Sequence, residues 1–249
     1  MNIVAELTLK ALRPLGGDAW AHYREALTRA CRRSPPPFGT WPYGDIYRDA
    51  ATDPHWLAGS LMANAAREAE GAGQLWDLAA CTSDPVVAGQ IAEHAIDESG
   101  HASAYIALLD LAFPGAVDDN FHAQLVSLSP GYTRESRLAP HDGSPFARPV
   151  TVDDLIQMNI AEIRTRVHHL LQRPMLLVHC APNRRHRLVR IMDTLLLDET
   201  RHIAYTAALI ETFARSGEAE HVRRLMGERM ADFNAITTEE VGRNVFTST

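Results

Sequence analysis

The chain has 249 residues, 46% of them hydrophobic and 7% aromatic, so it can bury one large core or two small ones, and its low aromatic content favours helices. Its three cysteines form no C-x-x-C pair, which argues against a zinc ribbon, a rubredoxin-type iron site and a disulfide framework, and its net charge of −7 argues against a nucleic-acid partner. No apolar run reaches membrane-spanning length and the first residues lack a signal-peptide pattern, so we expect a protein of the reducing cytoplasm without a membrane partner.

In the first third of the chain, the sequence predicts one helix before residue 33 and one long helix that begins after residue 53. Residues 1–33 read as a short lead-in and one helix, and residues 34–45 read as a loop because they are rich in proline and glycine. Asp53 as N-cap and Pro54 at the first helical position then begin a long helix that should end near Cys81.

The middle of the chain predicts a second long helix and a long connection. Ser83 or Asp84 serves as the cap of a helix over about 85–113. A shorter helix is expected over 118–128. The segment 129–149 is polar and rich in helix breakers, and it is interpreted as a lid or a crossover.

The last part of the chain predicts three further helices or helix segments. Thr151 caps a third long helix that runs toward Cys180 with a kink at Pro174. A fourth helix is expected from about 183 to 215, and residues 218–241 read as a further amphipathic helix.

No stretch shows a strand pattern, so the predicted fold class is all-α. Two helical hairpins joined by a long crossover are one way in which four-helix bundles are connected. We therefore expect a single domain over 1–249 whose bundle core covers about 54–215, with additional N- and C-terminal helices.

One motif occurs twice, as DESGH at 97–101 and as DETRH at 198–202. Residues three apart on a helix project to the same side, so each motif presents a carboxylate and an imidazole together. Both motifs lie on apolar stripes and therefore aim at the core. Burying these groups uncompensated would cost several kcal/mol, which a pair of metal ions with bridging carboxylates would offset.

The bridging carboxylate of the first hairpin follows from counting along two antiparallel helices. The turn centres near Ser83, and Glu98 lies 15 residues beyond it, so its partner should lie 15 residues before it. That residue is Glu68, which shares an apolar face. Glu70 is the competing candidate, but its own face is polar.

The bridging carboxylate of the second hairpin is less well placed. The turn centres near Pro182, so the partner of Glu199 should lie near residue 165. The nearest candidate is Glu162, which is also the only carboxylate in this stretch. A bulge or the Pro174 kink could absorb the offset of three residues.

The predicted ligand set therefore has four carboxylates and two histidines, namely Glu68, Glu98, His101, Glu162, Glu199 and His202. Mixed carboxylate and imidazole ligands suit Fe(II) or Mn(II) better than zinc. Asp97 and Asp198 precede the two motif glutamates. We expect each to accept a hydrogen bond from a ligating histidine on the facing helix, the alternative being an ordinary surface aspartate.

At these residues the chain resembles the ferritin-like di-iron carboxylate superfamily, and in particular its oxygenase branch, which includes bacterial di-iron monooxygenases and arylamine N-oxygenases. The resemblance covers roughly residues 54–215. It implies two Fe ions or an Fe/Mn pair, O2 as co-substrate, a small-molecule substrate in a nearby apolar cavity, and electrons from a ferredoxin or a reductase. A homodimer is one expected assembly.

The chain departs from its relatives at three positions. Some family members have a threonine one turn after the third-helix glutamate, where this chain has Arg166. Arylamine N-oxygenases carry an additional ligating histidine four residues before the second Glu-x-x-His, where this chain has Leu195. His94 lies four residues before Glu98 and could supply an extra ligand, although a hydrogen-bonded core histidine is the favoured reading. Among the remaining histidines, expected at the surface, His169 is the exception because it shares the face of Glu162.

The functional hypotheses are therefore three. The first is an O2-dependent oxygenase that performs hydroxylation, N-oxygenation or oxidative cleavage, favoured because the extra helices and the 129–149 segment could form a substrate pocket and lid. The second is a ferritin-like protein that oxidises or stores iron, for which a bare bundle would suffice. The third is a metal-free helical scaffold, which the apparent lack of an arginine or lysine on the motif stripes disfavours.

Overall fold

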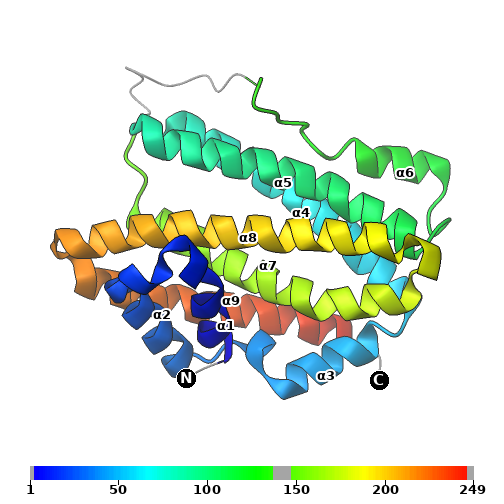
Figure 1. Cartoon of the computed structure of the whole chain (residues 1–249), viewed down its shortest axis with the longest axis horizontal. Coiled ribbons are helices and arrows are strands. Elements are labelled where there is room, and N and C mark those ends of the chain that lie inside the picture. Colours follow the sequence, from blue (N-terminus) through cyan, green and yellow to red (C-terminus); the bar gives the residue numbers. More distant parts are fainter. Residues whose placement is uncertain (1–2, 137–146, 246–249) are drawn as a thin grey trace. The chain divides into compact units, whose positions relative to one another are not determined.

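The computed structural model describes residues 3–136 and 147–245, with side chains described up to residue 239. Within these ranges the backbone forms helices and no strand, apart from an isolated bridge between Thr82 and Arg148, so the predicted all-α class is confirmed. Figure 1 labels the helices, which are α1 (Ile3–Leu12), α2 (Ala21–Arg33), α3 (Trp41–Ala50), α4 (Pro54–Cys81), α5 (Pro85–Ala112), α6 (Asp119–Val126), α7 (Val152–His179), α8 (Arg185–Phe213) and α9 (Ala219–Val245).

Side-chain caps begin the long helices where the sequence predicts them. The carboxylate of Asp53 accepts a hydrogen bond from the backbone N–H of His55 at 2.8 Å, and Asp84 accepts two from the first turn of α5. At the start of α7, the hydroxyl of Thr151 accepts from the N–H of Asp154 while the Asp154 carboxylate accepts from the N–H of Thr151. These caps satisfy the first backbone donors, which have no partner within the helix.

The predicted loop over residues 34–45 is wrong from Trp41 onward, because α3 begins there. Pro42 falls in the first turn of α3, where its missing N–H is not needed for a helical hydrogen bond. Thr40 also accepts a hydrogen bond from the N–H of Tyr43 at 3.4 Å. Proline at 42 is therefore a helix start rather than a helix stop.

The beginning of the chain also differs from the prediction, because the expected lead-in contains α1, which covers Ile3–Leu12. Helix α7 runs through Pro174 to His179, so its predicted end near Cys180 is confirmed. Between α8 and α9 the chain makes a tight turn at Gly217, whose φ of 106° is a left-handed conformation that glycine adopts without a steric penalty.

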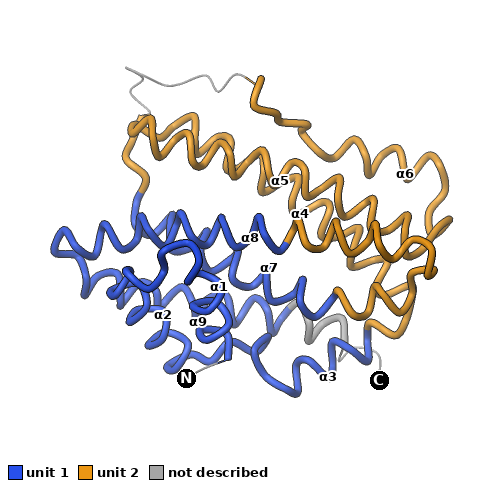
Figure 2. Tube along the Cα trace, viewed as in Figure 1, with its two compact units in different colours: residues 1–50, 151–172, 196–249 blue, residues 51–150, 173–195 orange. Residues whose placement is uncertain are grey.

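The chain divides into two compact units, which Figure 2 colours separately. Unit 1 contains residues 1–50, 151–172 and 196–249, and unit 2 contains residues 51–150 and 173–195. The division passes through α7 and α8, so each of these helices contributes to both units. The single domain over the whole chain stays a prediction.

Both predicted hairpins pair their helices antiparallel. Helices α4 and α5 of unit 2 pack together and are joined by the short connection 82–84. Between α7 and α8, Tyr205 contacts Met158, Arg166 donates to Thr200 at 2.9 Å, and Arg173 pairs with Asp193 at 2.7 Å. Positions rise along α7 as their partners fall along α8, which defines an antiparallel pair.

Unit 1 also contains a buried polar connection among three helices. The hydroxyl of Tyr23 on α2 donates to Asn159 Oδ1 on α7 at 2.9 Å, and the Asn159 amide donates to Thr206 Oγ1 on α8 at 2.9 Å. The N–H of Tyr23 donates to the buried carboxylate of Glu211. Because each of these buried groups has a partner, the connection fixes the rotation of α2 against α7 and α8.

In the described ranges, none of the helices has both the length and the apolar character needed to cross a bilayer.

Candidate metal centre

In unit 2, three of the predicted ligands come together between α4 and α5. One carboxylate oxygen each from Glu68 and Glu98 and one ring nitrogen of His101 lie within 4.8 Å of one another. Glu98 and His101 are buried and Glu68 is partly buried, and the shortest distance between His101 Nδ1 and Glu98 Oε1 is 3.3 Å. The α4–α5 register thus places Glu68 beside Glu98, which is the pairing that the counting argument predicts.

The competing carboxylate Glu70 lies elsewhere. It is exposed, and its Oε1 accepts a hydrogen bond from Gln74 Nε2 at 3.2 Å on the outer face of α4. Glu70 lies two positions after Glu68, and two positions along a helix correspond to about 200° of rotation around its axis. The structure therefore does not bring Glu70 to the motif.

A second imidazole also reaches Glu98. His94 Nε2 lies 3.4 Å from Glu98 Oε1, and its side chain is fully buried, so Glu98 has an imidazole one turn before it and another one turn after it. Burial alone would raise the pKa of Glu98, but a hydrogen bond from the Glu68 carboxyl and the interactions with His101 and His94 together hold this pKa well below its usual range.

This environment fits a cation chemically. Two negatively charged carboxylates at this separation, one buried and one partly buried, would repel each other. A divalent metal ion between them would neutralise both groups and would also accept the imidazole nitrogens as ligands. Glu68, Glu98 and His101, with His94 beside them, form the unit 2 half-site.

The unit 1 half-site repeats this chemistry on α7 and α8. His202 Nδ1 lies 3.5 Å from Glu199 Oε2, and both side chains are buried. A carboxylate oxygen of Glu162 lies within 4.8 Å of a ring nitrogen of His202. His169 Nδ1 lies 3.9 Å from Glu199 Oε1 and its side chain is fully buried. Helix α7 therefore supplies Glu162 near His202, and His169 near Glu199.

Arg166 provides a positive charge that the sequence argument overlooked. Its Nε donates to Thr200 Oγ1 at 2.9 Å, and although burial lowers its pKa, the negative charge of Glu199 acts in the opposite direction. The expectation that the motif stripes lack a facing arginine is therefore wrong for the second motif. The α7–α8 register places Arg166 opposite Thr200, and a helical wheel of α8 alone does not contain that information.

The two aspartates that precede the motif glutamates have different surroundings. Asp198 is buried, and its carboxylate pairs with the exposed Arg201 at 2.6 Å, one turn along α8. Asp97 is partly buried on α5. Hydrogen bonds from these aspartates to ligating histidines stay a prediction.

A segment beyond α6 is fastened directly to the first motif. The N–H of Tyr132 donates to the hydroxyl of Ser99 at 3.0 Å, and the hydroxyl of Ser129 donates to the Ser99 carbonyl at 2.7 Å. The Tyr132 ring stacks on Trp76 of α4, with centroids 4.3 Å apart. We call residues 129–136 the strap. Residues 137–146 of the expected lid or crossover lie outside the described residues, and Arg148 forms the isolated bridge with Thr82.

The surface expectation for the other second-half histidines is partly wrong. His168 is partly buried between the carbonyl of Arg164 and the hydroxyl of Tyr43, and His179 is bonded to the carbonyl of Ala51. His186 is exposed.

Comparisons of this chain with protein-family models, with curated proteins and with solved structures found no match, so its function is inferred from the side chains described above.

Proposed function

We propose that this protein is a non-haem di-iron oxygenase of the ferritin-like carboxylate type, which uses O2 to oxidise a small organic substrate. The observation that carries the proposal is the surroundings of Glu98, a buried carboxylate with a second carboxyl group and two imidazoles at ligand-forming distances. The second Glu-x-x-His repeats the pattern, with Glu199 between His202 and His169. A chance burial of charge is unlikely to repeat both the spacing and the chemistry.

The proposed centre uses both half-sites. Oxygen-rich ligation with a minority of imidazole suits Fe(II) or Mn(II), so we propose two Fe ions or an Fe/Mn pair, held by the six predicted ligands Glu68, Glu98, His101, Glu162, Glu199 and His202. Once bound, the metal pair supplies the redox chemistry for O2 activation, with electrons from a ferredoxin or a reductase.

The protein's own groups prepare this site in two ways. The carboxyl groups of Glu68 and Glu98 lie within 4.8 Å of each other, so one cation can neutralise both. In the other half-site, the Arg166 guanidinium near Glu199 reduces the net negative charge. The strap supports an oxygenase over an iron store, because it is an ordered addition to the helical bundle next to the first motif and a bare bundle would suffice for storing iron.

The experiment is anaerobic loading with Fe(II), followed by metal analysis and by measurement of O2 consumption. The wild type should hold two metal ions per chain and consume O2. Glu98→Ala changes unit 2 and His202→Ala changes unit 1. If the two half-sites form one centre, each variant should lose most of the bound metal and the O2 consumption.

The matched control is His186→Ala, which removes an exposed imidazole from the first turn of α8. It should keep both metal content and O2 consumption at the wild-type level. Loss of only one metal ion in each variant would contradict a shared centre, and normal metal content in both would contradict the ligand assignment. A many-subunit shell in light scattering, with many iron atoms per chain, would contradict the oxygenase in favour of iron storage.

A further inference from the structure

Unit 1 contains a strongly basic cavity that has no part in the proposed metal centre. It has a volume of about 370 Å³ and lies where α2 and α9 pack together. Its charged lining consists of Arg29, Arg32, Arg33, Arg223, Arg224 and Glu220. Five guanidinium groups thus converge against one carboxylate, in a chain whose net charge is −7.

Only part of this positive charge is neutralised by the protein. Arg223 pairs with Glu220 at 2.6 Å, Arg224 pairs with Glu228 at 2.8 Å, and Arg29 pairs with Glu25 at 3.4 Å. By contrast, Arg32 and Arg33 form no ion pair or hydrogen bond with any part of the chain that the structure describes.

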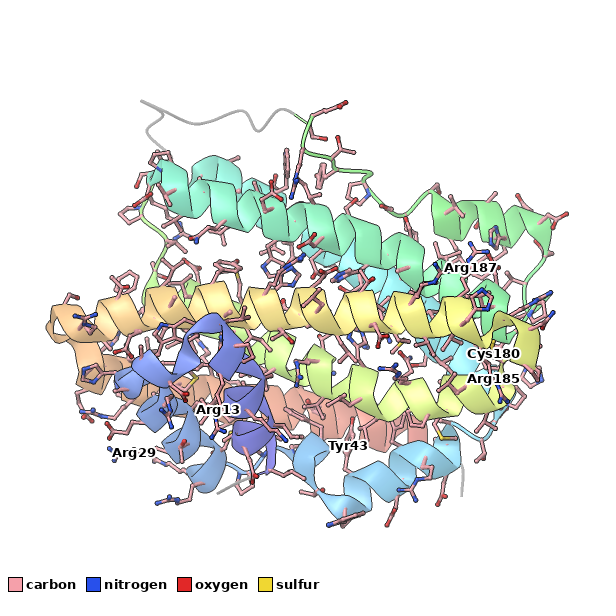
Figure 3. The ribbon with its side chains drawn as sticks, viewed as in Figure 1. Arg13, Arg29, Tyr43, Cys180, Arg185 and Arg187 are labelled. Atoms are coloured by element: carbon pink, nitrogen blue, oxygen red, sulfur yellow. The ribbon has the colours of Figure 1, made fainter. Side chains whose placement is uncertain are left out.

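The position of these two arginines adds a second point. Arg32 and Arg33 form the last turn of α2, where a positive charge is stabilised by the helix dipole. Arg29 lies one turn earlier on the same helix and is labelled in Figure 3. The end of α2 therefore places three arginine side chains along the cavity.

We propose that this cavity binds a small molecule that carries two or more phosphate groups. Guanidinium groups bind phosphate oxygens through paired, charge-assisted hydrogen bonds. The two guanidinium groups of Arg32 and Arg33 can each bind one phosphate group, and the volume falls within the range of small-molecule sites. The uncharged lining residues are Ala30 and Gly227, so no aromatic ring is present to stack on a base, and the phosphates carry the recognition.

The same lining argues against a protein partner. Protein interfaces are centred on buried aromatic anchors, and the cavity has none. A concave site with converging guanidinium groups suits a compact polyanion better than a flat acidic surface.

The test uses pyrophosphate as the probe, titrated into the full chain by calorimetry at low and at high salt. We expect saturable one-to-one binding that weakens as salt rises. Arg32→Gln combined with Arg33→Gln should weaken the binding by about tenfold or more, because both groups are uncommitted donors to the anion.

The matched control is Arg187→Gln combined with Arg190→Gln. It removes the same charge from two exposed arginines of α8, of which Arg187 is labelled in Figure 3. Both double variants should keep the wild-type helical circular dichroism, and the control should keep the wild-type affinity for pyrophosphate.

Three results would overturn the proposal. The first is the absence of saturable binding to the wild type. The second is an equal loss of affinity in both double variants, which would indicate a general charge effect. The third is equal affinity for citrate and pyrophosphate, which would show that the cavity does not select phosphate. Since the variants leave all proposed metal ligands in place, failure here and failure of the oxygenase proposal are separate outcomes.

Discussion

The carboxyl group of Glu68 is the least buried of the three ligands in the unit 2 half-site, and it can be tested against a close neighbour. Glu68→Ala should remove iron from the Fe(II)-loaded protein, because it deletes one of the carboxylates that the unit 2 half-site offers to the metal. Glu70→Ala should keep the wild-type iron content, because Glu70 is exposed and bonded to Gln74. Metal analysis of the two variants side by side checks this, and the opposite ranking would mean that the α4 register is wrong.

Cys31 and Cys81 should differ in reactivity because they differ in burial. Burial raises the pKa of the Cys31 thiol to about 12, whereas Cys81 is partly exposed at the end of α4. The thiolate is the reactive form. Iodoacetamide at pH 8 should therefore modify Cys81 while Cys31 stays unmodified, and both should react in denaturant. Peptide mass spectrometry provides the measurement, and rapid labelling of native Cys31 would contradict its burial.

A candidate ligand could be predicted from the sequence where its position depends on a single helix or on one short turn. Glu68 could be found by counting because α4 and α5 are regular and their connection is short. His169 and Arg166 could not be placed in the same way, since their roles depend on the α7–α8 register. Counting from Pro182 paired Glu199 with residue 165, whereas the structure places His169 near Glu199. The difference is about one helical turn, which the short 3-10 turn at 182–184 makes hard to anticipate.

Removal of one side-chain oxygen should weaken the attachment of the strap to α5. Ser99→Ala removes the oxygen that accepts the hydrogen bond from the Tyr132 N–H. Leaving that donor unsatisfied costs about 1–3 kcal/mol, so the strap should open about tenfold more often. Trypsin should then cleave after Arg134 about tenfold faster than in the wild type, as measured by mass spectrometry. Ser83→Ala, at an exposed serine before α5, is the control and should leave the rate unchanged.

Helices α7 and α9 are linked by an ion pair whose effect depends on pH. Hydrogen bonds from Arg229 lower the pKa of Asp153 below its ordinary value, so the pair stabilises the fold above that value and the stabilisation is lost as the pH falls through the lowered pKa. Asp153→Asn should lower the melting temperature by only about 1–3 °C at neutral pH, because the pair is partly exposed and solvent screens it.

The difference between Asp153→Asn and the wild type should shrink as the pH falls through the lowered pKa of Asp153, because the wild-type carboxylate then becomes protonated as well. Thermal melts at several pH values would show this trend. Asp232→Asn is the matched control, since its pairing with Arg229 lies within α9 alone and should matter less. A pH-independent difference would mean that Asp153 acts through packing.

Helix boundaries could be predicted where a side chain caps the helix. They could not be predicted where the same residue type can either begin or end a helix. Asp53, Asp84 and Thr151 all cap the helices expected of them. A proline inside a helix ends it, whereas a proline in the first turn is compatible with a helix start. Pro42 lies in the first turn of α3, and the sequence alone did not distinguish the two cases.

At the scale of the whole molecule, metal binding should raise the stability of the fold. A ligand at a hundredfold excess over its dissociation constant stabilises the native state by about 2.7 kcal/mol, which for a chain of this size is about 5–10 °C in melting temperature. Fe(II) or Mn(II) should produce this shift in the wild type and a chelator should reverse it. Glu98→Ala should melt at the same temperature with and without metal, and a metal-dependent shift in that variant would contradict the proposed ligand.

The all-helical class and the two hairpins could be predicted because they follow from local periodicity and short connections. The division into two compact units could not, because it runs through the middle of two continuous helices. The unit boundaries fall between residues 172 and 173 in α7 and between 195 and 196 in α8, and no break in the helical pattern of the sequence marks either position.

The discontinuity of unit 1 has a consequence for synthesis on the ribosome. Its first fifty residues emerge early, yet Tyr23 needs Glu211, and Ser34 needs Asn234. The apolar face of α2 that packs against α9 must therefore stay uncovered while most of the polypeptide is translated, which exposes it to chaperones.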